Sequence, residues 1–140
     1  MIATNNQVSV NREIKAAGKP KVLIVEDDVD TRLIARRALA LHGYDVIEAG
    51  DGVSAFELAR RQCPALIVLD MGLPGIDGWT VAGDIRAEPA LQHVPILAIT
   101  GYGMATAHRA AIEHGCTQAI CKPFKMNTFV QVVSQLLLAK

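Results

Sequence analysis

Residues 65–78 read ALIVLDMGLPGIDG, and this stretch decides the fold class. An apolar run, Ala65–Leu69, stops at Asp70 and is followed by a loop rich in glycine and proline. A short apolar run that ends in a polar residue is typical of a strand buried on both faces of a parallel sheet. The glycines and the proline then indicate a turn, and Asp77 can cap a helix that begins at Gly78.

The same unit, a short apolar run followed by an amphipathic segment, recurs along the chain from Lys21 onward. This alternation predicts an α/β fold, with helices covering both faces of a parallel sheet. We expect strands at Val22–Glu26, Asp45–Ala49, Ala65–Asp70, Val94–Thr100 and Gln118–Cys121. We expect helices at Val29–His42, Gly52–Gln62, Gly78–Ala87, Met104–His114 and Lys125–Ala139. Residues 1–20 are polar and end in Gly18 and Pro20, which predicts a flexible arm before one domain at residues 21–140.

The composition excludes several classes of protein. With 140 residues, of which 51% are hydrophobic and 20% charged, the chain suits one folded domain. Its 14 basic and 14 acidic residues give a formal net charge of zero and no overall attraction to nucleic acid. The apolar runs are too short to span a bilayer, and the polar N-terminus lacks a signal-peptide core. We therefore expect a cytoplasmic protein without membrane insertion or direct nucleic-acid binding.

Polar side chains follow four of the five predicted strands. They are Glu26, Asp27, Asp70, Thr100 and Lys122. The carboxyl ends of parallel strands meet at one edge of the sheet, where open α/β folds bind their ligands. The remaining strand, Asp45–Ala49, carries Glu48 near its end, and we interpret Glu48 as a solvated side chain outside the site.

Each of these side chains has an ordinary explanation when it is taken alone. Acidic residues cap helices, threonine suits a strand end, and a lysine before proline is a common loop residue. Together, however, they form a set that binds metal and phosphate. Clustered carboxylates repel one another unless a cation neutralises them, and their hard oxygen donors suit Mg²⁺. A carboxylate can also attack phosphorus while a metal and a lysine neutralise the transferring group.

These motifs resemble the receiver domains of two-component response regulators over roughly residues 21–139. The matching segments are VLIVEDD at 22–28, LDMGLPGIDG at 69–78, ITG at 99–101 and CKPF at 121–124. The resemblance implies a flavodoxin-like (CheY-like) fold. Such a fold is a doubly wound parallel sheet of five strands in the order 2-1-3-4-5, with five helices.

The resemblance also implies how a phosphoryl group is held. Asp70 accepts it, and Thr100 and Lys122 bind its oxygens. Gly101 leaves room for the group, and the Lys122–Pro123 peptide bond is cis in this family.

A magnesium ion is part of the same implied site. Asp27, Asp70 and the carbonyl oxygen of Gly72 hold the ion, and Glu26 acts on it through water. Asp28 is expected to begin the following helix.

The implied function is signalling by phosphorylation-dependent protein-protein interaction. The donor is a histidine kinase or a histidine phosphotransfer protein, and the phosphorylated form binds a downstream target. We expect no enzymatic activity beyond self-phosphorylation and self-dephosphorylation. The chain ends after the fifth predicted helix, which favours a stand-alone regulator; a receiver fragment of a larger hybrid kinase is the alternative. A magnesium-dependent phosphatase with an aspartate nucleophile is another, but Gly72 stands where such enzymes need a second aspartate.

One departure from the family concerns the output. Three residues before the lysine the family usually has an aromatic ring that turns inward on phosphorylation, and here the residue is Ala119. Tyr102 is the candidate to report the change instead, or to shield the phosphoryl group from water.

Two helices carry predicted contact surfaces. In the helix at Val29–His42, helical spacing assigns Ile34, Ala38 and Leu41 to the core. The opposite face is expected to dock the donor and contains Val29, Leu33, Arg36 and Ala40. In the last helix, an apolar face that begins at Met126 should pack on the sheet. The outward face carries no charge, which suggests a homodimer through the fourth and fifth helices.

Overall fold

The structure, a computed structural model, describes residues 18–101 and 104–139. Its strands are β1 (Lys21–Val25), β2 (Asp45–Ala49), β3 (Leu66–Asp70), β4 (Ile96–Thr100) and β5 (Gln118–Cys121). They form one sheet in the order β2-β1-β3-β4-β5, and every neighbouring pair is parallel. The predicted strand order is confirmed.

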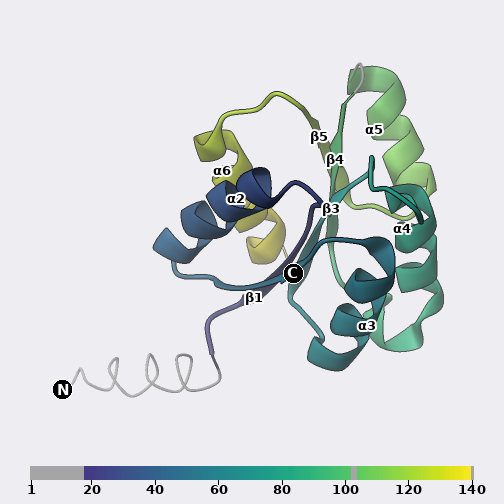
Figure 1. The fold of residues 1–140 in the computed structure, drawn as a ribbon, viewed down its shortest axis with the longest axis horizontal. Helices are drawn as coiled ribbons and strands as arrows, with labels where there is room; N and C mark the ends of the chain where they lie inside the picture. Colours follow the sequence, from purple (N-terminus) through teal and green to yellow (C-terminus); the bar gives the residue numbers. More distant parts are fainter. Residues whose placement is uncertain (1–17, 102–103, 140) are drawn as a thin grey trace.

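Helices cover both faces of this sheet. They are α2 (Val29–Leu41), α3 (Gly52–Gln62), α4 (Gly78–Ala87), α5 (Met104–Glu113) and α6 (Met126–Leu138). In Figure 1 the sheet is seen nearly edge-on, with α2 and α6 on one side and α3, α4 and α5 on the other. This is the flavodoxin-like, doubly wound arrangement that was expected.

The predicted boundaries agree with the observed ones to within one or two residues. The 3₁₀ turn η1 (Pro89–Leu91) was not predicted. It lies before β4, which begins at Ile96 rather than at Val94. Pro95 has no N–H to give to a neighbouring strand, and its carbonyl oxygen accepts a hydrogen bond from the N–H of Ile67 (3.0 Å). The regular strand β4 therefore starts directly after Pro95, at Ile96.

The strands separate the core into two parts. In β1, Val22 and Ile24 belong to the cluster beneath α2 and α6, while Leu23 and Val25 belong to the cluster beneath α3, α4 and α5. Successive side chains of a strand point to opposite faces, so that a strand covered on both faces must be apolar throughout. The polar residues are consequently confined to the strand ends.

Three helices begin at an aspartate that caps them. Each side chain accepts a hydrogen bond from the backbone N–H three residues further on. The pairs are Asp28 with Thr31 (2.9 Å), Asp51 with Ser54 (2.8 Å) and Asp77 with Thr80 (2.9 Å). Asp28 and Asp77 are thus the helix-start residues that were predicted, and Asp51 caps α3 in the same way.

The predicted core face of α2 was wrong. Ile34 and Leu41 are 54% and 86% exposed, whereas Ala35 and Leu39 are buried and Ala38 is half-buried. Ala35 and Leu39 are four residues apart and therefore share a face of the helix. The helix is therefore rotated so that Ala35 and Leu39, rather than Ile34 and Leu41, face the sheet.

The apolar face of α6 was predicted correctly. Phe129, Val130 and Val133 are buried against the sheet. On the flank of the helix, the Ser134 hydroxyl forms a hydrogen bond with the Tyr44 hydroxyl (2.7 Å), which ties α6 to the segment before β2.

Two sequence predictions concern regions that the structure does not describe. Of the predicted arm at 1–20, only residues 18–20 are described, and Tyr102 also lies outside the described residues. Within residues 18–101 and 104–139, no helix is long and apolar enough to cross a membrane.

Candidate functional site

The carboxyl ends of β1, β3, β4 and β5 border one open cleft with a volume of about 1130 Å³. All six predicted site residues line it. They are Glu26, Asp27, Asp70, Gly72, Thr100 and Lys122. The structure therefore brings together residues from four separate parts of the chain.

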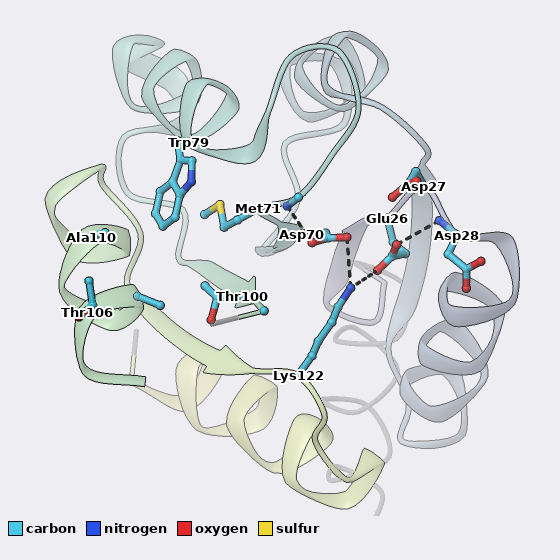
Figure 2. Close-up of a pocket in the computed structure, with 13 residues that line it drawn as sticks. Glu26, Asp27, Asp28, Asp70, Met71, Trp79, Thr100, Thr106, Ala110 and Lys122 are labelled. Carbon is cyan, nitrogen blue, oxygen red and sulfur yellow. Dashed lines mark hydrogen bonds and ion pairs between the residues drawn. The ribbon is translucent and has the colours of Figure 1, made fainter. Parts of the chain in front are cut away.

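Asp70 is the last residue of β3, and it is buried. Its Oδ1 accepts a hydrogen bond from the backbone N–H of Gly72 (3.0 Å). Its Oδ2 lies 3.4 Å from Nζ of Lys122. These contacts hold the carboxylate at both oxygens, and its position at the strand end directs it into the cleft (Figure 2).

Lys122 follows β5, and its peptide bond to Pro123 is cis, as the resemblance implied. Its Nζ lies 3.4 Å from Oδ2 of Asp70 and 3.6 Å from Oε1 of Glu26. Burial lowers the pKa of Lys122, but the charges of Asp70 and Glu26 outweigh this effect and raise the pKa above its usual value. Lys122 is therefore an ammonium ion at neutral pH, beside the two carboxylates.

Glu26 and Asp27 form the turn between β1 and α2. Glu26 is buried, and its Oε2 accepts a hydrogen bond from the backbone N–H of Asp28 (3.0 Å). Burial raises the pKa of Glu26 and the charge of Asp70 adds to this, whereas Asp28 and Lys122 act in the opposite direction without cancelling the shift. Asp27, in contrast, is exposed at the mouth of the cleft.

The three carboxylates have the chemistry of a divalent metal site. One oxygen from each of Glu26, Asp27 and Asp70 lies within 4.8 Å of the others. The nearby ammonium of Lys122 supplies one positive charge to three carboxylates, so that a further cation would relieve their repulsion. Hard oxygen donors fit Mg²⁺. The carbonyl of Gly72 stays a predicted ligand, because the contact that the structure gives Gly72 is through its N–H.

Thr100 ends β4 and is buried at the floor of the cleft. Its hydroxyl donates a long hydrogen bond of 3.5 Å to the carbonyl oxygen of Ile120. Such a bond is weak, which leaves the hydroxyl available to a new acceptor. On β5, the position that holds an aromatic ring in the resembling family is occupied by the buried Ala119.

The cleft has a second, mostly apolar wall that the sequence did not reveal. It is formed by Met71, Trp79, Thr106, Ala107 and Ala110. Figure 2 shows Trp79 on this wall, away from the acidic residues. The position of Trp79 directly after the predicted helix start at Gly78 is a signal that could have placed it near the site. The residues of α5 offered no such signal.

Gly78 explains how α4 approaches the site. A Cβ at this position would lie 2.6 Å from the carbonyl oxygen of Asp70 and equally close to Met71. Only glycine lets the first turn of α4 lie directly against the loop that follows β3.

Glu48 is exposed and does not line the cleft, as predicted, but it also pairs with two arginines. Its Oε1 lies 3.0 Å from Nε of Arg32, and its Oε2 lies 3.1 Å from Nε of Arg36. The reason is the strand order: β2 lies beside β1, so that the end of β2 faces the first turns of α2. Arg32 also donates a hydrogen bond to the backbone oxygen of Glu26 (2.7 Å).

Comparisons with known proteins agree with this geometry. The model of the response regulator receiver domain matches residues 22–134. A protein named as transcriptional regulator ycf27 from Porphyridium aerugineum is 36% identical over 106 residues, which are 76% of this chain; the chain spans only 43% of that relative's length. The polar-differentiation response regulator DivK of Brucella anthropi is 30% identical over 116 residues, which cover 83% of this chain and 94% of DivK.

A solved structure is similar over the same region. It is the receiver domain of the sensor histidine kinase PA1611 from Pseudomonas aeruginosa, crystallised with a magnesium ion in its active-site cleft. The identity is 28% and the TM-score 0.78, and the match covers 85% of this chain and 98% of that one.

Proposed function

Because this chain belongs to the response regulator receiver domain family, whose members accept a phosphoryl group and signal through it, we propose that Asp70 is the phosphoacceptor. One observation carries the proposal. The Asp70 carboxylate lies in the cleft with Oδ2 only 3.4 Å from the Lys122 ammonium, in a cluster with two further carboxylates. Among residues 18–101 and 104–139, no other aspartate is at once buried, paired with a cation and part of a carboxylate cluster that could hold a metal ion.

The proposed step is a displacement at phosphorus. A carboxylate oxygen of Asp70 forms a bond to phosphorus while the bond from phosphorus to the donor breaks. A phosphohistidine donor leaves as imidazole, which keeps the electron pair and takes up a proton. Lys122 and Thr100 are proposed to bind oxygens of the transferred group, because both side chains line the same cleft as Asp70.

Magnesium completes the proposed site. Glu26, Asp27 and Asp70 would hold the ion, together with the Gly72 carbonyl. When bound, the ion neutralises the carboxylates and the charge of the transferring group. The acidic cluster supports this assignment, as does the magnesium ion in the cleft of the PA1611 receiver domain.

Receiver domains interact with histidine kinases and downstream effectors. For this chain we propose a histidine kinase or a histidine phosphotransfer protein as the donor and a protein target in the cytoplasm. We propose no turnover of external substrates, because Gly72 stands where an aspartate-nucleophile phosphatase would carry its second acid.

Self-association through α5 and α6 is a further part of the proposal. The exposed face of α6 contains uncharged side chains and ends in Leu138, which is 84% exposed. Burying such a face removes no charge from water. Sedimentation velocity over a range of concentrations should show a dimer that a charge at Gln131 weakens; a monomer at every concentration would exclude this dimer.

The test of the phosphoacceptor uses acetyl phosphate. With Mg²⁺, the intact protein should gain the mass of one phosphoryl group, and Asp70→Asn should abolish the gain. Asp84→Asn is the control, because Asp84 is exposed on α4 outside the cleft, and this variant should be labelled like the wild type. Labelling of the Asp70→Asn variant, or labelling that survives chelation of Mg²⁺, would contradict the proposal.

A further inference from the structure

Arg32 connects three elements beside the acidic cluster. From the first turns of α2, its Nε binds Oε1 of Glu48 on β2 (3.0 Å), and its Nη1 donates a hydrogen bond to the backbone oxygen of Glu26 (2.7 Å). The side chain is only 20% exposed. Gly50, after the end of β2, leaves room for the guanidinium, since a Cβ there would lie 3.2 Å from Nη1.

The acceptor of this bond has a special position. The carbonyl of Glu26 belongs to the peptide unit that joins Glu26 to Asp27, and a peptide unit is planar and rigid. A hydrogen bond on that oxygen therefore fixes the direction in which the chain leaves Glu26 toward Asp27. The peptide unit before Glu26 is fixed as well, because the N–H of Glu26 donates to the carbonyl oxygen of Ala49 (3.1 Å).

From this arrangement we infer that Arg32, oriented by Glu48, is a positioning residue for the metal site. It holds the peptide between Glu26 and Asp27 so that their carboxylates converge with that of Asp70. This inference rests on the proposed magnesium site and adds to it two residues that lie outside the acidic cluster.

The fork of the guanidinium suits this role. Arginine presents several N–H donors in a fixed plane, so that one side chain can bind a carboxylate and a carbonyl at the same time. Lysine carries the same charge on a single nitrogen and cannot span both acceptors in this way. The loss of a partner that orients a metal ligand typically weakens metal binding by about 10- to 100-fold.

A purely electrostatic role predicts the opposite sign. Arg32 places a positive charge near a cation site, so that its removal alone would tighten Mg²⁺ binding. Arg36 separates the two effects, because it pairs with the same Glu48 (3.1 Å) from the same helix. Among the described residues, it forms no hydrogen bond with the turn between β1 and α2.

The experiment is a Mg²⁺ titration of the full chain, followed by the fluorescence of Trp79 and repeated by calorimetry. Trp79 is the one tryptophan of the sequence and lines the same cleft. Arg32→Met should weaken Mg²⁺ binding about tenfold or more. Arg32→Lys should weaken it as well, although it keeps the charge, and Arg36→Met should leave binding unchanged or slightly tighter.

Tight Mg²⁺ binding by Arg32→Met, or an equal loss in Arg36→Met, would overturn the inference. Thermal unfolding in EDTA shows whether each variant is folded; if Arg32→Met is not, Arg32→Lys decides. At saturating Mg²⁺ the labelling rate with acetyl phosphate should return to that of the wild type, and a rate that stays low would also count against a role in metal positioning.

These results separate the inference from the proposed function. A wild-type protein that binds Mg²⁺ but is not labelled on Asp70 refutes the phosphoacceptor while the role of Arg32 stands. A labelled wild type whose Arg32 variants bind Mg²⁺ equally well refutes only the role of Arg32.

Discussion

Glu26 is a buried carboxyl group whose charge is disfavoured unless a cation is bound. Its pKa lies above the usual glutamate value, first because of burial and then because of the Asp70 charge. A group with a raised folded-state pKa holds its proton longer in the folded protein than in the unfolded chain. Without metal, its contribution therefore lowers the free energy of unfolding as the pH rises from the ordinary glutamate pKa through the raised one.

Glu26→Gln should separate these effects. The amide keeps an acceptor for the N–H of Asp28 and removes the repulsion with Asp70, so that the variant in EDTA should unfold at the same or a higher Tm than the wild type at neutral pH. Mg²⁺ at 100 times the Kd of the wild type should raise the free energy of unfolding of the wild type by about 2.7 kcal/mol. The same concentration should stabilise the variant by less, because the variant binds Mg²⁺ more weakly. Thermal unfolding by circular dichroism, with EDTA and with Mg²⁺, measures both quantities.

Two results would contradict this assignment of Glu26. One is a clear fall in Tm of the variant in EDTA, which would mean that the charged form stabilises the fold. The other is an undiminished shift with Mg²⁺, which would place the ion elsewhere.

At the scale of the elements, α2 shows how a helix can be rotated away from its predicted face. Ile34 and Ala35 are neighbours in sequence, and both residues are apolar. Apolar spacing alone cannot decide which of them faces the sheet. In the structure the smaller one does, and Leu39 follows it into the core while Leu41 points to solvent.

Truncation of the two leucines tests this rotation. Leu39 is fully buried, so that Leu39→Ala should lower the free energy of unfolding by about 2–5 kcal/mol. Leu41 is 86% exposed, and Leu41→Ala should change it by no more than about 0.5 kcal/mol. Urea unfolding of both variants gives the comparison. A larger loss of unfolding free energy in Leu41→Ala than in Leu39→Ala would instead support the helix rotation predicted from the sequence.

The difference between local and long-range information explains which features of the fold and the site could be predicted from the sequence. The strand ends were predictable because strands buried on both faces admit polar residues only where they stop, and Asp70 and Thr100 stand there. The Arg32–Glu48 ion pair could not be predicted from the sequence, because its residues are 16 positions apart and meet only where β2 lies beside β1. The apolar wall of the cleft likewise depends on how α5 packs against the sheet.

For the whole molecule, the cleft opens where α2 begins, and α2 exposes apolar side chains along its length. Val29, Ile34 and Leu41 are 63%, 54% and 86% exposed. Isolated exposed apolar residues are common, but Ile34 and Leu41 are seven residues apart and share a face of the helix. An exposed apolar face on a helix that starts at a reaction site is suited to docking a partner helix. A small phosphodonor needs only the cleft, whereas a protein donor must also contact the surface around it.

Comparing two donors tests this surface. Leu33, which was first assigned to the docking face, is half-buried, so that Ile34 is the better position for a charge. Ile34→Asp should slow transfer from a phosphorylated histidine phosphotransfer protein roughly tenfold, equivalent to about 1.4 kcal/mol of lost contact energy. Labelling by acetyl phosphate should stay unchanged, because Ile34 does not line the cleft.

Leu41→Asp is the matched control for distance. Leu41 lies seven residues, or about 10 Å, further along α2 from the reaction site, and its side chain is even more exposed than that of Ile34. A donor whose histidine must reach Asp70 contacts the start of α2 before its end, so that the charge at Leu41 should slow transfer less than the charge at Ile34. Equal slowing with both donors would show that the Ile34 variant has damaged the cleft itself. Unchanged transfer from the protein donor in both variants would exclude this face of α2 as the docking surface, and the donor would then have to approach Asp70 across the opposite wall of the cleft, past Trp79.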